Sequence, residues 1–185
     1  MITPERIIEF WFEQSGPQHW FKQSDAFDAE IRREFETSAV ALAAETGRKP
    51  THKWEETRHG TLALLIALDQ FPRNMYRGTK AAFTWDHLAL GVAVRATDKG
   101  EDLKTEQNRR SFFYMPFMHS EDIAMQQRCV ELIDSRLDNA STLHHAKEHR
   151  RVIERFGRFP HRNKILGRAS TSEEVSFLNN GGYSP

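Results

Sequence analysis

Residues 60–70 read Gly-Thr-Leu-Ala-Leu-Leu-Ile-Ala-Leu-Asp-Gln, and this stretch constrains the fold more than any other part of the chain. Apolar side chains go nearly all round it when it is drawn as a helix, which is typical of a helix that is buried on every side. We therefore predict a central helix over about 54–70. Pro72 should end this helix, because the residue before a proline is pushed away from the α region.

The flanking segments also favour helices. Thr3 before Pro4 predicts the start of a first helix that ends at Gly16, and Ser24 is expected to cap a second one that ends near Gly47. Sequence periodicity predicts further helices at about 80–97, 106–114, 121–137, 141–156 and 172–178, the last preceded by a capping box. No stretch alternates as a strand would. The predicted fold is all-α, a single domain over 1–185 of about seven or eight helices, with 179–185 as a loose tail.

Charge and cysteine content limit the classes of function. Lys and Arg total 26, as do Asp and Glu, so the basic surplus that nucleic acid or a membrane surface attracts is absent and we expect neither partner. The single cysteine, Cys129, lies in a helical pattern and is expected in the core. The chain shows no leader-like start and no apolar run long enough for a bilayer, so we expect a cytoplasmic protein.

Two similar segments carry most of the distinctive polar residues. Phe-Pro-Arg-Asn at 71–74 is followed by Gly78, and Phe-Pro-His-Arg-Asn at 159–163 is followed by Gly167, each glycine four residues after the Asn. Both segments follow an apolar helix, so we expect the same device to finish two helix ends. We call them the first and the second Phe-Pro segment.

The second Phe-Pro segment and its surroundings are rich in hydrogen-bond donors. Arg158, Arg162, Arg168 and Asn163 lie within a few residues of one another. Such a cluster binds a carboxylate or a phosphate, or it braces acidic residues of the same chain, and the aromatic residues between the cations could stack on a planar ring. The sequence leaves both interpretations open.

Asp69 is a candidate site residue because it lies near the end of the apolar helix. A carboxylate there faces the negative end of the helix dipole, and burial destabilises it further unless a cation pairs with it. Arg73 is the nearest candidate, and Arg158 or Arg162 could reach it from the second segment. Asp69 is therefore either half of a structural salt bridge or a carboxylate of the functional site.

His119 is a second candidate. Ser120 is expected to cap the next helix, and Glu121 and Asp122 then lie in its first turn and stabilise it. His119 is left without a structural role, at a helix start that would also accommodate an anion.

A third histidine candidate lies in His-Ala-Lys-Glu-His at 145–149, which matches an inverted zinc-protease motif. The motif is short, the chain has nine histidines, and Lys147 and Arg150 place positive charge beside it. A mixed metal site could also be formed by Asp69, His119, His149 and His161. The sequence supports the zinc-protease site and the mixed site only weakly, so we expect no metal and no cofactor.

Several motifs, in order, resemble the bacterial domain of unknown function 924 family. They occur at 8–12, 20–21, 68–74, 77–79, 116–122, 156–163, 166–168 and 173–174, and the resemblance covers nearly the whole chain. It implies an all-α fold similar to tetratricopeptide-like helical hairpins, and no established activity. His149 matches a histidine of the family pattern, whereas His145 has no counterpart in it, which further weakens the zinc interpretation.

The leading hypothesis is one polar pocket that binds a small anionic molecule, formed where the two Phe-Pro segments meet the His119 helix start. Asp69, His119 and His149 are the candidate catalytic residues. The candidate ligand-binding residues are Arg73, Asn74, Glu121, Arg158, His161, Arg162, Asn163 and Arg168.

Two other classes of function stay open. One is a metal-independent hydrolase or lyase with His119 or His149 as general base and Asp69 as its orienting partner. The other is a module whose superhelical groove binds a peptide or a protein. Exposed side chains of Trp20, Trp54 and Trp85 would favour such a groove. The sequence determines neither the oligomeric state nor whether the protein is an enzyme.

Overall fold

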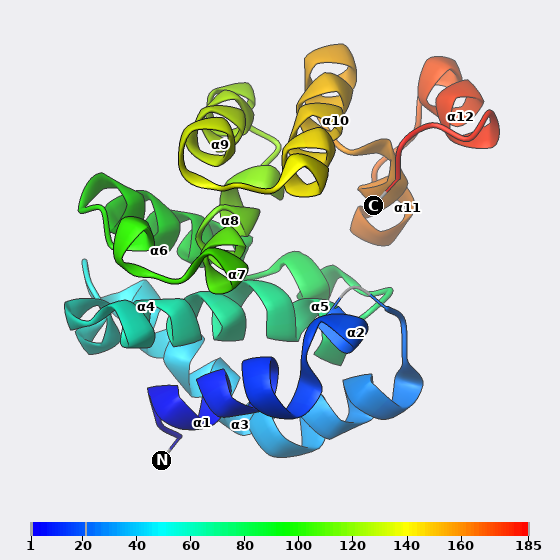
Figure 1. The fold of residues 1–185 in the computed structure, drawn as a ribbon. Coiled ribbons are helices and arrows are strands. Elements are labelled where there is room, and N and C mark those ends of the chain that lie inside the picture. Colours follow the sequence, from blue (N-terminus) through cyan, green and yellow to red (C-terminus); the bar gives the residue numbers. More distant parts are fainter. Residues whose placement is uncertain (1, 21, 185) are drawn as a thin grey trace.

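Helices are the regular elements of the computed structural model, which describes residues 2–20 and 22–184 (Figure 1). No strand occurs among these residues, so the all-α prediction is confirmed. Phe21, part of the expected motif at 20–21, lies outside them. The α-helices are α1 (Pro4–Ile8), α2 (Pro17–Trp20), α3 (Asp25–Arg48), α4 (Arg58–Leu65), α5 (Phe71–Met75), α6 (Asp86–Asp98), α7 (Gln107–Arg110), α8 (Met115–Met118), α9 (Ile123–Arg136), α10 (Ala140–Phe156), α11 (Asn163–Leu166) and α12 (Ser172–Asn179).

Short helical turns of other types extend or connect these helices. The π-helical turns Glu9–Ser15 and Ile66–Gln70 continue α1 and α4. The 3-10 turns are Lys53–Glu56, Lys80–Phe83, Asp102–Lys104, Ser111–Phe113 and Pro160–Arg162.

The apolar stretch forms the centre of the molecule, as predicted. Its apolar residues at 62–68 are at most 1% exposed, and α4 packs against α1 and α6. Beyond it, the fully buried ring of Phe71 contacts the rings of Phe10, Trp11 and Phe35, which come from the first helix and from α3. This aromatic cluster fixes the start of the first Phe-Pro segment in the core.

The expectation that Pro72 ends the central helix is wrong. The chain continues through the π-helical turn Ile66–Gln70 into α5, and the Phe71 N–H donates to Ile66 O, five residues back. Proline has no N–H, and its ring clashes with the carbonyl four residues earlier. The wider π turn accommodates both constraints without ending the helix, and it places Asp69 and Gln70 on the wide turn.

Other boundaries also differ from the sequence expectations. Asp122, not Ser120, caps α9: its carboxylate accepts from Ala124 N, while Ser120 Oγ accepts from Asp122 N. Glu121 therefore precedes the helix and is free to reach another element. The expected helix at 80–97 is a 3-10 turn followed by α6. The expected helix at 106–114 is a series of short helical turns, and Pro116 follows them inside α8.

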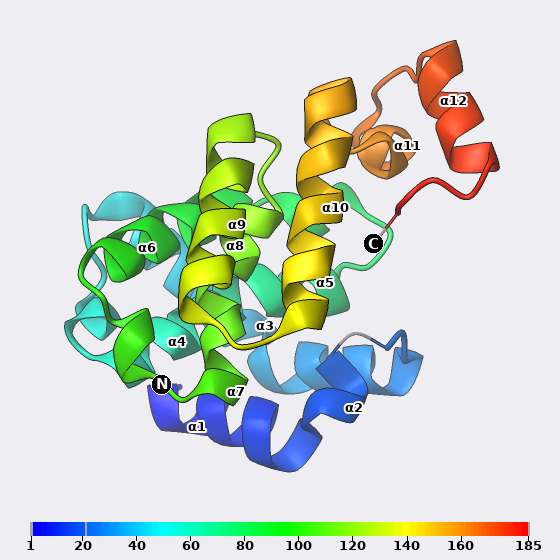
Figure 2. The ribbon, with the colours of Figure 1, turned by 45° about the horizontal axis from the view of Figure 1, so that its top comes forward.

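The C-terminal part forms an arm that extends from the helical body (Figures 1 and 2). α10 lies alongside α9 and ends at Gly157, whose φ of 67° suits glycine. The predicted capping box before α12 is confirmed, between Thr171 and Glu174. Tyr183, in the expected loose tail, packs against the His149 ring. Pro185 lies outside the described residues.

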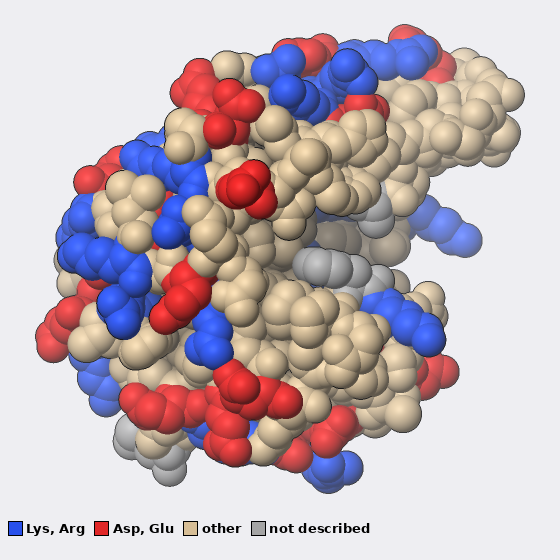
Figure 3. All heavy atoms as spheres, in the orientation of Figure 1, with Lys and Arg blue, Asp and Glu red and all other residues tan. Residues whose placement is uncertain are grey.

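Charges of both signs are mixed over the face in Figure 3, which is hollowed between the C-terminal arm and the body. Among the described residues, no helix combines the length and the apolar character that crossing a bilayer requires. Cys129 is fully buried, in the core position that the helical pattern suggested.

The buried carboxylate of Glu174 should hold the C-terminal arm together. It accepts both Nε and Nη2 of Arg158, Nδ2 of Asn163 and the Thr171 N–H. Glu174→Ala leaves these donors without their acceptor and should lower the free energy of unfolding by about 2 kcal/mol. Urea denaturation measures it.

Glu173→Ala is the matched control. Glu173 pairs with Arg155 on the surface, with side chains 63% and 52% exposed, so its loss should change stability by less than about 0.5 kcal/mol. Equal effects of the two substitutions would contradict the bracing role of Glu174.

Candidate functional site

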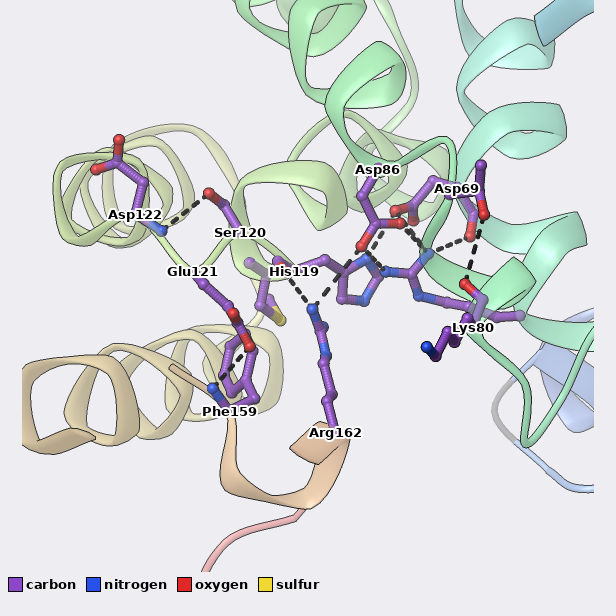
Figure 4. Close-up of polar contacts among 12 residues, drawn as sticks. Asp69, Lys80, Asp86, His119, Ser120, Glu121, Asp122, Phe159 and Arg162 are labelled. Carbon is purple, nitrogen blue, oxygen red and sulfur yellow. Dashed lines mark hydrogen bonds and ion pairs between the residues drawn. The ribbon is translucent and has the colours of Figure 1, made fainter. Parts of the chain in front are cut away.

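A buried carboxylate and a partly buried imidazole form a pair at the π turn (Figure 4). Asp69 is 1% exposed, and its Oδ1 lies 2.8 Å from Nδ1 of His119, which follows α8. The other carboxylate oxygen accepts from Gln70 Nε2 at 2.5 Å. The pair links the central helix to the segment between α8 and α9.

Arg73 provides the positive charge that the buried Asp69 requires. Its Nη1 lies 3.3 Å from Asp69 Oδ1 and donates to the Asp69 carbonyl at 2.7 Å. The same guanidinium binds both carboxylate oxygens of Asp86, the first residue of α6, at 2.9 and 3.0 Å. Asp69 and Arg73 therefore do form the predicted ion pair, and Asp86 extends it.

These charges set the ionisation of the pair. Burial alone would raise the pKa of Asp69, but the Arg73 guanidinium and the His119 ring outweigh it and lower that pKa to about 2. Burial and the positive charge of Arg73 lower the pKa of His119 below its usual value, despite Asp69. At neutral pH the ring is thus uncharged, Nδ1–H donates to Asp69, and Nε2 carries a lone pair.

Arg162 reaches the same place from the second Phe-Pro segment (Figure 4). The residue is only 7% exposed, and its guanidinium carbon lies 4.8 Å from the centre of the Phe83 ring and 4.4 Å from that of Phe159. Its Nη1 donates to the His119 carbonyl at 3.0 Å. Burial and the nearby Arg73 lower the pKa of Arg162 to about 10, so it stays charged at neutral pH.

The hydrogen-bonding capacity of Arg162 is only partly used. Its Nε is buried and finds no partner among the described residues. The nearest carboxylate oxygen in an ion pair with it, Asp86 Oδ2, lies 3.8 Å from Nη1, beyond hydrogen-bonding distance. A buried guanidinium nitrogen is seldom left without an acceptor in a folded protein.

His119 and Arg162 both line a cavity of about 350 Å³. It lies between α6, the segment from α8 to α9, and the second Phe-Pro segment. The remaining lining residues are Phe83, Asp86, His87, Leu90, Pro116, Ser120, Glu121 and Leu166.

The fold and this geometry can be compared with known proteins. The family described as "Bacterial protein of unknown function (DUF924)" matches residues 7–182. The chain belongs to the DUF924 family. A solved structure, of the protein of unknown function ATU0120 from Agrobacterium tumefaciens, is similar to this chain at 43% sequence identity. The match covers 96% of this chain and 97% of that one, with a TM-score of 0.89. Curated proteins gave no match.

Membership of the DUF924 family confirms the resemblance found in the sequence. The family description assigns no activity, so the function of this DUF924 protein has to be argued from its site. The likeness to tetratricopeptide hairpins stays a prediction.

Most donors of the second Phe-Pro segment are used for internal bracing. Arg168 binds both oxygens of Glu121, at 2.6 and 2.9 Å, and its Nε donates to Asn163. Glu121 also accepts the Phe159 N–H. Arg158 is committed to Glu174. Of the second-segment arginines predicted as ligand-binding, Arg162 is therefore the one that lines the cavity.

The polar residues of the first Phe-Pro segment also differ in where they point. Arg73 supports the site from behind His119, but Asn74 donates to Asp28 Oδ1 on α3 at 2.8 Å, where Arg77 also binds. Asn74 thus points to a different part of the molecule. A ligand-binding role for it stays a prediction that this geometry does not favour.

His149 lies behind the second Phe-Pro segment. Its Nδ1 lies 2.8 Å from the His145 carbonyl, and its ring packs edge-on against Phe159 and Tyr183. No hydrogen bond joins it to Asp69 or His119 in the described part of the chain. Its catalytic role stays a prediction, whereas the geometry supports a role in packing.

His161 is next to Arg162 and is partly buried. Burial, together with the positive charge of Arg162, lowers its pKa to about 4. Its Nδ1 is buried and finds no partner in the described structure. His161 does not line the cavity, so its ligand-binding role also stays a prediction.

The histidines of the zinc-like motif have other contacts. His145 Nδ1 lies 2.9 Å from the Tyr183 hydroxyl, and His149 Nδ1 is bonded to the His145 carbonyl. In the residues that the structure describes, no group of three or more His, Cys, Asp or Glu side chains is arranged to hold a metal ion.

Sequence reasoning missed three contributors to the site. Asp86 neutralises Arg73, Phe83 packs against Arg162, and Gln70 holds the second oxygen of Asp69. Gln70 adjoins Asp69 in the sequence and could have been suspected. Asp86 and Phe83 are ordinary members of a helical pattern, and only the three-dimensional contacts reveal them.

The burial of His149 predicts how the stability of the protein depends on pH. Burial lowers the pKa of His149 to about 3, against about 6.5 in an unfolded chain. Between these values the unfolded state binds one more proton than the folded state, so stability falls as pH falls. In His149→Gln the free energy of unfolding should depend less on pH: its slope against pH should be lower by about 1 kcal/mol per pH unit between pH 6 and 4.5.

Urea denaturation at several pH values measures this slope. His59→Gln, a substitution of the same type at an exposed position, is the control. An unchanged slope in His149→Gln would show that His149 does not stay neutral in the fold.

Proposed function

We propose that this protein binds a small anionic molecule in the cavity lined by His119 and Arg162, and that His119 acts on it as a general base. The observation that supports this most is the state of Arg162. It is buried and charged, it lines a cavity, and no carboxylate of the described residues lies within hydrogen-bonding distance of it.

The hydrogen bonding of the charged groups supports an anionic ligand. Two carboxylates line the cavity, Asp86 and Glu121, and each is bound through both oxygens by an arginine, Arg73 and Arg168. Arg73 also pairs with Asp69, so the three carboxylates balance the three guanidinium groups of Arg73, Arg168 and Arg162. Arg162 is the one of these arginines that no carboxylate of the described residues hydrogen-bonds, so an anion can form charge-assisted hydrogen bonds with it in a partly desolvated site.

The Asp69–His119 pair suits proton transfer. Asp69 holds the ring through Nδ1, which leaves Nε2 as the proton acceptor in a ring that lines the cavity. The lowered pKa keeps this nitrogen unprotonated at neutral pH. Arg162 can stabilise negative charge that develops on a ligand beside it. These parts suit proton abstraction, hydrolysis or elimination, the hydrolase or lyase alternative of the sequence analysis.

The peptide-binding alternative finds less support. Trp54 is buried, and Trp20 and Trp85 are partly buried against Trp11 and Tyr76, so the exposed tryptophans that a groove would favour do not occur. The exposed large apolar side chains, Val40, Leu103, Ile123 and Val175, come from four different parts of the chain.

Removal of the Arg162 charge should weaken anion binding. We expect at least one of acetate, hexanoate, benzoate and inorganic phosphate to raise the melting temperature of the wild type, since a ligand at 100 times its Kd adds about 2.7 kcal/mol. Arg162→Gln should weaken that ligand at least tenfold, because the charge-assisted hydrogen bonds are lost. Thermal shift and isothermal titration calorimetry measure both.

Arg33→Gln is the control, because the Arg33 side chain is 71% exposed, and it should bind as the wild type does. The far-ultraviolet circular dichroism of Arg162→Gln checks that the variant is folded. A folded Arg162→Gln protein that binds the same anion with wild-type affinity would overturn the proposed site.

A further inference from the structure

We infer that the ligand of this cavity is a monocarboxylate with an apolar body, and not a phosphorylated or multiply charged metabolite. The inference rests on the proposed anion site and names its substrate class. It comes from two features of the cavity, the Arg162 guanidinium, which no carboxylate of the described residues hydrogen-bonds, and the apolar side chains around it.

Arg162 offers hydrogen-bond donors for one carboxylate. Phe83 and Phe159 pack against its planar guanidinium, Nε is inaccessible, and Nη1 already donates to the His119 carbonyl. A ligand therefore meets the Nη end of the guanidinium, which suits the oxygens of one carboxylate. A second negative charge would find no free guanidinium, because Arg73 and Arg168 are bound to Asp86 and Glu121 in the same wall.

The rest of the cavity is suited to an apolar group. Phe83 from the turn before α6, Leu90 from α6, Pro116 from α8 and Leu166 from α11 line it. They come from four elements, so an apolar body would be enclosed from several sides. The cavity volume of about 350 Å³ is at the lower end of ligand sites, which limits the ligand to a small molecule.

The two features also orient the ligand. Arg162 Nη1 donates to the carbonyl of His119, so the guanidinium and the imidazole belong to neighbouring parts of one wall. A carboxylate bound at Arg162 would bring the adjacent carbon of the ligand toward the His119 ring. The apolar body would then extend along the side chains of Leu90 and Leu166.

Isothermal titration calorimetry with a matched series tests the inference. The probes are acetate, butyrate, hexanoate and benzoate, with inorganic phosphate as the charged competitor and benzyl alcohol as the neutral counterpart of benzoate. Each buried methylene should raise affinity by up to about fourfold, so hexanoate should bind at least tenfold more tightly than acetate. Phosphate and benzyl alcohol should bind at least tenfold more weakly than benzoate.

Leu166→Ser should reduce the preference for hexanoate over acetate at least threefold, because the apolar contact of the longer chain is lost. Leu103→Ser, at a side chain that is 51% exposed and outside the cavity, is the matched control and should keep the wild-type preference. An unchanged preference in Leu166→Ser would contradict the apolar subsite.

The outcomes separate the substrate class from the proposed function. If phosphate binds more tightly than hexanoate and Arg162→Gln abolishes it, the anion site stands and the monocarboxylate inference is wrong. If benzyl alcohol binds as tightly as benzoate, the charge has no role and both fail. If no anion of the series binds, the proposed function fails and the inference fails with it.

Discussion

The hydrogen bond between Asp69 and His119 is the interaction on which the rest of the site depends. A carboxylate that is 1% exposed would destabilise the fold unless its charge were compensated. The guanidinium of Arg73 compensates this charge, and Asp86 in turn binds Arg73. The His119 ring also forms a hydrogen bond with Oδ1 of Asp69. The central helix, α6 and the segment after α8 are therefore joined at one point, and Arg162 adds the C-terminal arm through the His119 carbonyl.

The two Phe-Pro segments show that similar sequences need not form the same structure. In the first, the phenylalanine lies in the aromatic core and the proline is absorbed by a π turn inside a continuing helix. In the second, the helix has already ended at Gly157, and the proline opens a 3-10 turn. The first segment thus continues the helix that carries Asp69, and the second carries Arg162 to the cavity.

The sequence was sufficient for what depends on local pattern. It predicted the all-α fold, the buried helix at 62–68 and the capping box of α12, and it named Arg73 as the nearest of three candidate partners for Asp69. It failed where contacts far apart in the sequence decide. Glu121 leaves the first turn of α9 because Arg168, 47 residues later, binds it, and Asp122 then takes the cap. Arg162 could not be told from Arg158 in the sequence, because burial and the choice of carboxylate partner separate them.

The most direct test of this account is the tautomer of His119, observed by proton–nitrogen NMR of the histidine rings at pH 7 and assigned with His119→Gln. We predict a neutral ring protonated on Nδ1, with an Nε2 resonance that moves when an anion is added. In Asp69→Asn this preference for the Nδ1–H form should be lost, because the amide can donate to the ring. A charged ring, or one protonated on Nε2 in the wild type, would contradict the central role of the Asp69–His119 pair.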